Sequence, residues 1–404
     1  MPALVNIAYL ATCLDEGDQA NIHHLRDAAI VWEDSEILWI GKEDELPAEY
    51  ATKKIYDAGG KMVIPGLVDC HTHLAFGGWR PDEFEMRLKG NSYLDIAKAG
   101  GGILSTVEAT RNSTSEELFQ KASGFLERMA SLGVTTVECK SGYGLSIRDE
   151  LKILRVYQRL ADEQSLNIVA TFLGAHTIPP EYKHDREGYI DLLIDEMIPA
   201  VADEDLADFC DVFVEDSAFS AKEAKRILTA ARQAGMLPKL HADQLTSCGG
   251  AELAAELDAA SADHLEKITD NGIRAMAESG VIGVCLPLAS LYTQQEPLNC
   301  RKLIDEGVQV AVATDFNPGS APSYNLPLAM MLACNLGRLT PSEVLKSATI
   351  YAAKAIGLEK KIGSIEPGKS ADFVVIDAPD PNFWMYHYRP NCCEQVFADG
   401  VKII

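Results

Sequence analysis

The sequence predicts an α/β protein that combines a (β/α)8 TIM-like barrel with a small β-sandwich domain formed from both chain ends. Short runs of β-branched residues recur through the middle of the chain at intervals of roughly 30 residues, with amphipathic helical stretches between most of them, which is typical of repeated βα units. Both ends instead alternate apolar and polar residues without a helical period. We therefore expect the β-sandwich domain over residues 1–60 and 363–404, and the barrel over residues 61–362.

Each barrel strand is expected at a short apolar run. In chain order the eight runs are 62–73, 134–140, 167–176, 208–216, 237–243, 259–266, 281–288 and 308–315. Amphipathic stretches such as 115–133 and 220–235 lie between them, and each begins with Ser and ends with Gly, as helix capping favours. Eight strands that alternate with helices predict a closed barrel.

The chain ends carry strand patterns of another kind. The segments AAIVWEDSEILWIG (28–41), ADFVVID (371–377) and EQVFADGVKII (394–404) read as strands joined by turns, so the simplest inference is that the two ends pair with each other. The longest connection within the barrel is 76–105, which includes Gly100, Gly101 and Gly102. An active-site lid and a surface excursion with a flexible hinge both fit this connection.

Charge and cysteine usage exclude several partners and locations. The chain has 60 Asp and Glu against 36 Lys and Arg, and its formal charge of −24 would repel phosphate backbones and anionic lipid. We therefore expect no nucleic-acid partner and no membrane partner. The ten cysteines have no regular spacing, and the N-terminus lacks both a basic segment and an apolar stretch near ~20 residues. These features predict a cytoplasmic protein.

The histidines gather at the ends of the predicted strands. His71 and His73 lie two residues apart at the end of an apolar run, so on a strand both side chains point to one face and can hold one metal ion. Two polar residues at a strand end would look the same. However, His176, His241 and His264 also fall at or near strand ends, and the carboxyl ends of barrel strands form the reactive face. Their joint occurrence favours a functional site over scattered structural histidines.

Four side chains make a sensible metal shell: His71, His73, His241 and Asp315, the last polar residue of the eighth strand. Three nitrogens and one oxygen suit one Zn²⁺ or Fe ion and leave room for a water molecule, and the sequence does not decide between the two metals. A metal ion at such a site lowers the pKa of its water toward ~7, which supplies a nucleophile at neutral pH. The pattern therefore predicts hydrolysis.

Several motifs resemble those of the amidohydrolase superfamily, and the resemblance spans nearly the whole chain. The motifs are PGLVDCHTH, KLHAD, SADHLE and VATDFNPG, followed by EPGKSADFVVID and VFADGVKI. Members with two metal ions carry a bridging Lys on the fourth strand, and the fourth predicted strand here has none. The resemblance therefore implies one metal ion per subunit. Lys140 is the competitor for a bridging role, but it falls on the second strand.

Further segments resemble the superfamily members that open the ring amide of 4-imidazolone-5-propanoate, giving N-formimino-L-glutamate in histidine degradation. These segments are FGGWRPDEFEMRLKG, ECKSGYGL, TFLGAHTIP, HADQL and TDFNPGSAP. The resemblance implies that Arg80 binds the propanoate and that Tyr143 contacts the substrate. It places His176 and Gln244 at the ring. It also implies a loop around the carboxylate end of the substrate, made by Asn317, Gly319 and Ser320.

The residues alone leave alternatives for several of these assignments. Arg80 could pair with Asp82 or Glu83 on the surface, and Tyr143 between two glycines could simply end a strand. The segment 317–319 consists of turn formers whatever the function.

The expected proton chemistry follows from a departure at Gln244, where some members carry Glu. An amide cannot act as a general base, so proton transfer is expected to rest on Asp315, His264 or His176. In the preferred scheme Asp315 takes the proton of the water, His264 orients the nucleophile, and His176 polarises the carbonyl or the amidine.

Two other functions remain to be weighed. A deaminase of a purine, pyrimidine or related ring could use the same barrel with one metal ion, and it would release ammonia. A non-catalytic barrel that serves as an interaction scaffold is disfavoured, because all four expected metal ligands are present. The expected partner is a small anionic heterocyclic substrate, and a homodimer is the default assembly because two-fold dimers are the commonest.

Overall fold

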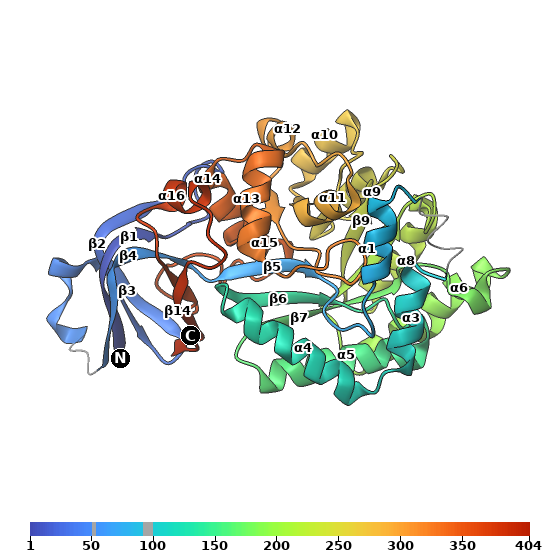
Figure 1. Cartoon of the computed structure of the whole chain (residues 1–404), viewed down its shortest axis with the longest axis horizontal. Helices are drawn as coiled ribbons and strands as arrows, with labels where there is room; N and C mark the ends of the chain where they lie inside the picture. Colours follow the sequence, from blue (N-terminus) through green and yellow to red (C-terminus); the bar gives the residue numbers. More distant parts are fainter. Residues whose placement is uncertain (51–53, 92–99) are drawn as a thin grey trace.

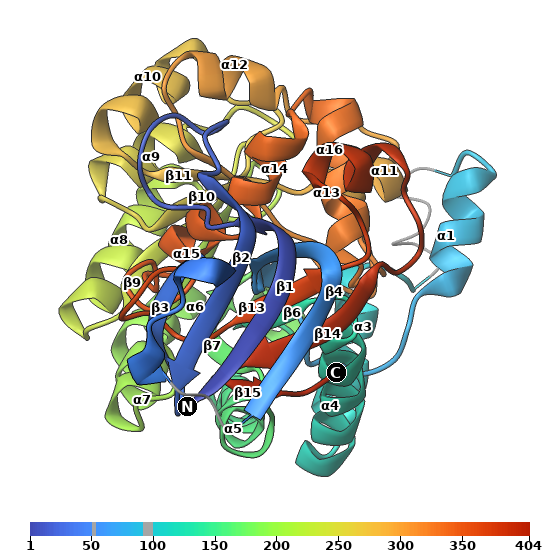
Figure 2. The same cartoon turned by 90° about the vertical axis from the view of Figure 1, so that its left-hand side faces the viewer.

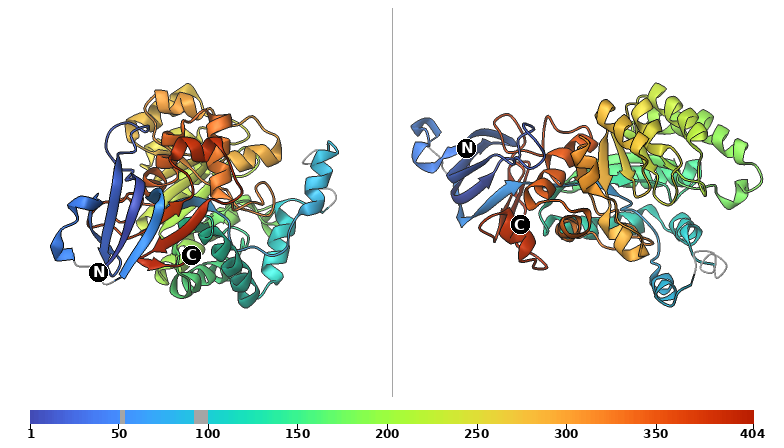
Figure 3. Two further views of the ribbon diagram at one scale, coloured as in Figure 1. Left: turned by 60° about the vertical axis from the view of Figure 1, so that its left-hand side comes forward. Right: turned by 90° about the horizontal axis from the view of Figure 1, so that it is seen from above.

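The computed structural model describes residues 1–50, 54–91 and 100–404. It confirms the predicted fold class: a barrel of parallel strands lies beside a second sheet that is built from both chain ends. Figures 1 and 3 show this sheet at one end of the molecule, with both termini close to it. The interpretation of 76–105 as a lid or a surface excursion falls partly on residues 92–99, outside the described residues.

Eight parallel strands in the order β12-β11-β10-β9-β8-β7-β6-β5 form the barrel. They are β5 (Leu67–Thr72), β6 (Val134–Lys140), β7 (Asn167–Ala175), β8 (Phe209–Val214), β9 (Leu237–Ala242), β10 (Ser261–His264), β11 (Ile282–Cys285) and β12 (Val310–Val312). The ends of the sheet meet where the amide of Asp315 donates to the carbonyl of His71 (3.0 Å) and the amide of His73 donates to the carbonyl of Phe316 (2.8 Å). This closure brings the first and last strands together at the predicted site.

The apolar run from Met62, expected as one barrel strand, forms two strands in different sheets. Strand β4 (Lys54–Pro65) belongs to the second sheet, and β5 begins directly after Gly66. A Cβ atom at Gly66 would collide with the side chain of Thr135, so the close approach of the two chain segments requires glycine there. The chain passes from one unit into the other without a linker.

Helices surround the barrel, as Figures 1 and 2 show. They are α1 (Pro81–Leu88), α3 (Ile103–Asn112), α4 (Ser115–Ala130), α5 (Ile147–Glu163), α6 (Arg186–Leu192), α7 (Ile198–Asp203), α8 (Ala221–Gln233), α9 (Gly250–Glu256), α10 (Asp270–Ser279), α11 (Pro287–Thr293), α12 (Cys300–Asp305), α13 (Leu326–Gly337), α14 (Pro341–Ser347) and α15 (Ile350–Ala355). Ser220 caps α8 as expected, whereas the cap of α4 is Thr114 and not Ser115, because Thr114 forms a capping box with Glu117. Within the described ranges, no helix combines the length and the apolar character needed to cross a membrane.

The second sheet has seven strands in the order β15-β14-β13-β4-β1-β2-β3. Besides β4 they are β1 (Pro2–Ala11), β2 (His24–Glu33), β3 (Glu36–Lys42), β13 (Phe373–Ile376), β14 (Cys393–Ala398) and β15 (Val401–Lys402), with α16 (Pro381–Tyr386) between β13 and β14. N-terminal and C-terminal strands meet where β13 pairs antiparallel with β4. The sheet has its own apolar core around Trp32, whose ring packs edge-on against Phe373 and Phe397.

Candidate active site

A cavity of about 500 Å³ opens at the carboxyl ends of the barrel strands and contains the predicted site. Eleven of the twelve site residues predicted from the sequence line it: His73, Arg80, Tyr143, His176, Gln244, His241, His264, Asp315, Asn317, Gly319 and Ser320. The twelfth, His71, is fully buried next to this lining. The structure therefore brings the whole predicted set to one place, although its members come from most of the strands.

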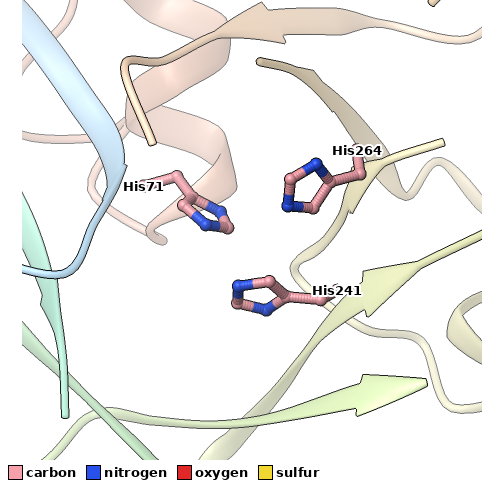
Figure 4. Close-up of side chains that lie close together, drawn as sticks. All are labelled: His71, His241 and His264. Carbon is pink, nitrogen blue, oxygen red and sulfur yellow. The ribbon is translucent and has the colours of Figure 1, made fainter. Parts of the chain in front are cut away.

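The four predicted metal ligands converge at the bottom of the cavity. The Nε2 atoms of His71 and His73 each lie 3.4 Å from Oδ1 of Asp315, and Nε2 of His73 lies 3.4 Å from Nε2 of His241. His71, His241 and His264 form an overlapping group, with one donor atom from each within 4.8 Å of the others. Figure 4 shows these three rings pointing toward one another from β5, β9 and β10.

Carboxylates behind two of the histidines fix which ring nitrogen faces the cavity. Nδ1 of His71 donates to Asp263 at 2.6 Å, and Nδ1 of His241 lies 3.0 Å from Asp211. Each Nε2 lone pair is then left to face the other donors, and Nε2 of His71 has no hydrogen-bond partner among the described residues. This donor set of three imidazoles and one carboxylate fits a divalent metal ion.

The protonation of the imidazoles also suits a metal ion. Burial lowers the pKa of His73, and burial lowers the pKa of His241 to about 3 against the opposing effect of Asp211. Both rings are therefore neutral at pH 7, the form that binds a metal ion. At His71 burial and the nearby Lys140 lower the pKa, but Asp263 and Asp315 outweigh these effects and raise it.

Lys140, the competitor for a bridging role, is committed to other partners. It is fully buried, and its Nζ atom lies 2.8 Å from both Glu138 and Asp211 and 3.6 Å from Asp263. Although burial lowers the pKa of Lys140, these three carboxylates raise it far above its usual value. Lys140 thus neutralises the carboxylates that contact His71 and His241.

The carboxylates around Lys140 were not predicted from the sequence, and their signal there is weak. Glu138, Asp211 and Asp263 are charged residues inside runs that otherwise read as buried strands. A charge inside such a run signals a buried partner, but the partner can be named only when the strand order and register are known.

Two predicted catalytic residues have an uncommon backbone conformation. His264 has φ = 79° and Asp315 has φ = 53°, both in the left-handed region, where residues other than glycine are rare. Such strain is typical of functional sites, and here it lies where β10 and β12 end at the cavity. Nδ1 of His264 also lies 3.7 Å from the carboxylate of Glu266. Burial lowers the pKa of His264, but Glu266 and Asp315 outweigh this effect and raise it.

Tyr143 and His176 form one wall of the cavity on the strand-end loops after β6 and β7. The ring of His176 lies 5.1 Å from that of His73 and 5.4 Å from that of Tyr143. The loop that carries Tyr143 is held by the buried carboxylate of Glu150, which accepts hydrogen bonds from the amides of residues 142, 144 and 145. Tyr143 therefore lies in a turn after β6 that the carboxylate of Glu150 holds in place.

Arg80 forms the ion pair with Glu83 that its sequence position allowed, and its side chain also lies at the cavity. Its Nε and Nη2 atoms donate to the two carboxylate oxygens of Glu83 at 2.9 and 2.8 Å, and the side chain also lines the cavity. Its guanidinium packs directly over Gly319, where a Cβ atom would collide with it. A side chain at position 319 would therefore displace the Arg80 guanidinium. Arg87, which was not predicted from the sequence, lines the cavity as well.

The loop 315–320 is ordered from within by Asn317. Its side-chain oxygen accepts from the amides of Gly319 and Ser320 at 2.8 Å, and its Nδ2 donates to the carbonyl of Asp315 and to Oγ of Ser320. The Asn317 amide is thus used in shaping the loop. By contrast, the side chain of Gln244 faces the cavity from a loop held by Glu215, which accepts from the amides of Leu245 and Thr246.

Comparisons with known proteins agree with this geometry. A family model described as the amidohydrolase family matches residues 62–402. An imidazolonepropionase of Geobacillus kaustophilus is 48% identical over 379 residues, covering 93% of this chain and 89% of that protein. Others from Fusobacterium nucleatum (48%; 92% and 90% covered) and Shewanella baltica (46%; 97% and 96% covered) are similarly close. The chain belongs to the amidohydrolase family and, within it, to the imidazolonepropionase family.

Solved structures with low sequence identity share the fold. An atrazine chlorohydrolase from Arthrobacter aurescens complexed with zinc has a TM-score of 0.75 at 15% identity, covering 100% of this chain and 95% of that one. An adenosine deaminase from Xanthomonas campestris with bound zinc has a TM-score of 0.73 at 18% identity, covering 99% and 92%. The barrel and the sheet of chain ends therefore recur together across enzymes with different substrates.

Proposed function

We propose that this chain hydrolyses the ring amide of 4-imidazolone-5-propanoate to N-formimino-L-glutamate. The proposal rests above all on one cavity that contains both a set of metal-binding imidazoles and guanidinium groups. A small ring that bears a carboxylate matches both features. The imidazolonepropionases that cover most of this chain support the same substrate.

His71, His73, His241 and Asp315 would hold one Zn²⁺ or Fe ion per subunit. When bound, such an ion polarises a carbonyl oxygen and lowers the pKa of water toward ~7. The neutral rings of His73 and His241 and the orphaned Nε2 of His71 supply the nitrogen donors. The donor set does not discriminate between the two metals.

Asp315 and His264 would divide the proton transfers. Burial raises the pKa of Asp315, but the imidazoles of His71 and His73, each 3.4 Å from its Oδ1, and the nearby His264 hold it well below its usual value. Its carboxylate is therefore ionised and can take the proton of the attacking water. His264, whose pKa is raised, can orient that water and give a proton to the ring nitrogen as the C–N bond breaks. Ring opening then gives one product, which carries both the new carboxylate and the formimino group.

His176 would accept a hydrogen bond from the substrate. Its Nδ1 lies 3.0 Å from the carbonyl of Gly142, and because a carbonyl only accepts, Nδ1 carries the proton. Burial and the neighbouring His73 and His241 lower the pKa of His176 well below its usual value, so the ring is neutral. Its Nε2 lone pair is thus free to accept from a ring N–H. This geometry favours contact with the amidine side of the ring over polarisation of the carbonyl.

Arg80, Tyr143 and Gln244 would bind the substrate without taking part in proton transfer. Gln244 offers both donor and acceptor groups to the ring, and its amide cannot act as a base. The loop shaped by Asn317, with Gly319 and Ser320, would close around the carboxylate end beside Arg80. A homodimer and a cytoplasmic location remain predictions from the sequence.

The test is to supply freshly made 4-imidazolone-5-propanoate to the purified protein and follow the loss of its ultraviolet absorbance. The product is then identified by mass spectrometry, and ammonia is measured in the same sample. We expect N-formimino-L-glutamate and no ammonia in the initial phase. Absence of turnover would contradict the proposal, and stoichiometric ammonia would indicate a deaminase instead.

A further inference from the structure

Two guanidinium groups and one carboxylate form a cluster on the wall of the cavity that α1 provides. Arg80, Glu83 and Arg87 make up this arginine cluster, and both arginines line the cavity. Their formal charges sum to one net positive charge. Among the described residues that line the cavity, the acidic one is Asp315, which belongs to the metal-binding group. Within the described part of the lining, no carboxylate other than Asp315 is present to balance the net positive charge of the arginine cluster.

Arg80 is already paired with the carboxylate of Glu83 through two hydrogen bonds. Glu83 accepts from both Nε and Nη2 of Arg80 and also from the amide of Gly102, which ties α1 to the start of α3. Burial raises the pKa of Glu83, but these contacts outweigh burial and lower it, so the carboxylate is ionised. This bidentate ion pair offsets the charge of Arg80 and occupies one edge of its guanidinium.

The guanidinium of Arg87 has fewer hydrogen-bond partners than that of Arg80. Its Nη2 donates to the carbonyl of Gly319 at 2.8 Å, while its Nε is buried without a hydrogen-bond partner among the described residues. Burial lowers the pKa of Arg87, and the neighbouring Arg80 lowers it further. Arg87 is half-buried, and an inaccessible N–H donor without a partner is unfavourable unless an anion completes the site.

We infer that Arg87 is the guanidinium that gives this site its preference for a carboxylate-bearing substrate. This inference rests on the proposed function, because it concerns the propanoate of the same substrate. Arg80 packs over Gly319 and Arg87 bonds the carbonyl of the same residue, so both guanidinium groups meet at one loop. The substrate carboxylate binds between them, and Arg87 supplies the charge that Glu83 leaves uncompensated.

The experiment compares Arg87→Met with wild type on two substrates. One is 4-imidazolone-5-propanoate, and the other is its propanamide analogue, which keeps the chain length and lacks the charge. We expect kcat/KM for the carboxylate to fall on the order of 10- to 100-fold through KM, since hydrogen bonds to charged groups are strong. For the propanamide we expect wild type and variant to differ less than about threefold. Arg87→Lys should recover part of the loss, because it restores the charge without the planar fork.

Controls distinguish binding of the carboxylate by Arg87 from a purely structural role of its side chain. Lys89→Met removes an exposed cation that pairs with Glu85 on the same helix, and it should leave both substrates unaffected. Metal content and the thermal midpoint should be the same in wild type and Arg87→Met.

Two results would overturn the inference. If Arg87→Met loses activity equally on both substrates, Arg87 merely shapes the Gly319 loop and the inference is wrong. If it loses nothing on the carboxylate, the inference is also wrong. Failure of the proposed function would appear differently, as wild-type protein that does not turn over the carboxylate substrate.

Discussion

The rim of the barrel and the sheet of chain ends are both well buried, but they are buried with opposite kinds of side chain. At the rim, the buried set consists of imidazoles, carboxylates and a lysine, such as His71, Asp263 and Lys140. In the core of the end sheet it consists of apolar groups around Trp32 and Phe373. Burying charges is unfavourable unless each has a partner, whereas burying apolar surface is the main source of stability. The core of the end sheet therefore contributes stability without contributing side chains to the candidate site.

The largest expected effect is a loss of activity caused by a substitution at the rim of the barrel. Asp315→Asn keeps the shape of the side chain but removes the carboxylate proposed as metal ligand and proton acceptor. We expect turnover to fall by at least about 10²- to 10⁴-fold, the usual contribution of a general base. Steady-state assays and metal analysis check this. Asp377→Asn, at a half-buried aspartate far from the cavity lining that pairs with Lys61 and Arg389, is the matched control and should leave both unchanged. Full activity of Asp315→Asn would remove Asp315 from the mechanism.

A substitution in the core of the end sheet is expected to lower stability and to leave activity unchanged. Trp32→Ala removes a fully buried ring that packs against Phe373 and Phe397, and it should lower the free energy of unfolding by about 3–5 kcal/mol. Urea unfolding measures this loss. Trp32→Phe should lose less, since it keeps an aromatic ring there. At temperatures well below unfolding we expect kcat to stay at the wild-type value. A fall in kcat in a folded Trp32→Ala protein would contradict the claim that the core of the end sheet does not affect catalysis.

A smaller effect, on metal affinity, is expected at Asp263, which contacts the proposed metal ligand His71. Asp263→Asn removes the charge that holds Nδ1 of His71, and we expect metal affinity to fall by about 10- to 100-fold. Competition with a chelator of known affinity measures the change. The exposed Asp399→Asn serves as control. Unchanged affinity would mean that Asp263 matters for the neutralisation of Lys140 and not for the metal ion.

The smallest effect is expected outside both regions, on helix α8. Hydrogen bonds from Arg186 and Ser220 lower the pKa of Glu223 to about 2 from a usual value of 4.5. Since the folded-state value is depressed, the stabilisation is present above pH 4.5 and is lost as the pH falls toward 2. Because these contacts lie at the surface, Glu223→Gln should cost about 0.5–1 kcal/mol at pH 7. Urea unfolding should show this difference shrinking as the pH is lowered below 4.5. A difference that stays constant down to pH 4 and below would assign it to the capping geometry and not to charge.

Much of the fold and of the site could be predicted from the sequence because its signals are local. Alternation of strands and helices predicts the barrel, and the spacing of His71 and His73 predicts a shared face. The prediction of a single strand was wrong at Gly66, because the apolar residues on both sides outweighed the break signal of Pro65-Gly66. The close contact of Gly66 with Thr135, which lies far along the chain, could not be predicted from the sequence.

What the sequence could not predict depends on contacts between distant strands. Asp211, Asp263 and Lys140 come from three strands, and their pairing follows from barrel register. Glu150 supports the Tyr143 loop from a helix face, where a glutamate usually faces solvent. Arg87 was missed because one turn of helix separates it from Glu83, and a surface ion pair would give the same spacing.

The most direct test of a single catalytic metal ion is to remove it from the protein and restore it in measured steps. Metal-free protein is titrated with Zn²⁺ or Fe²⁺ while bound metal and hydrolysis of 4-imidazolone-5-propanoate are measured in the same samples. We predict that activity is absent without metal, rises in proportion to bound metal and saturates at one ion per chain. Full activity in metal-free protein, or activity that saturates only at two ions per chain, would contradict a site with one catalytic metal ion.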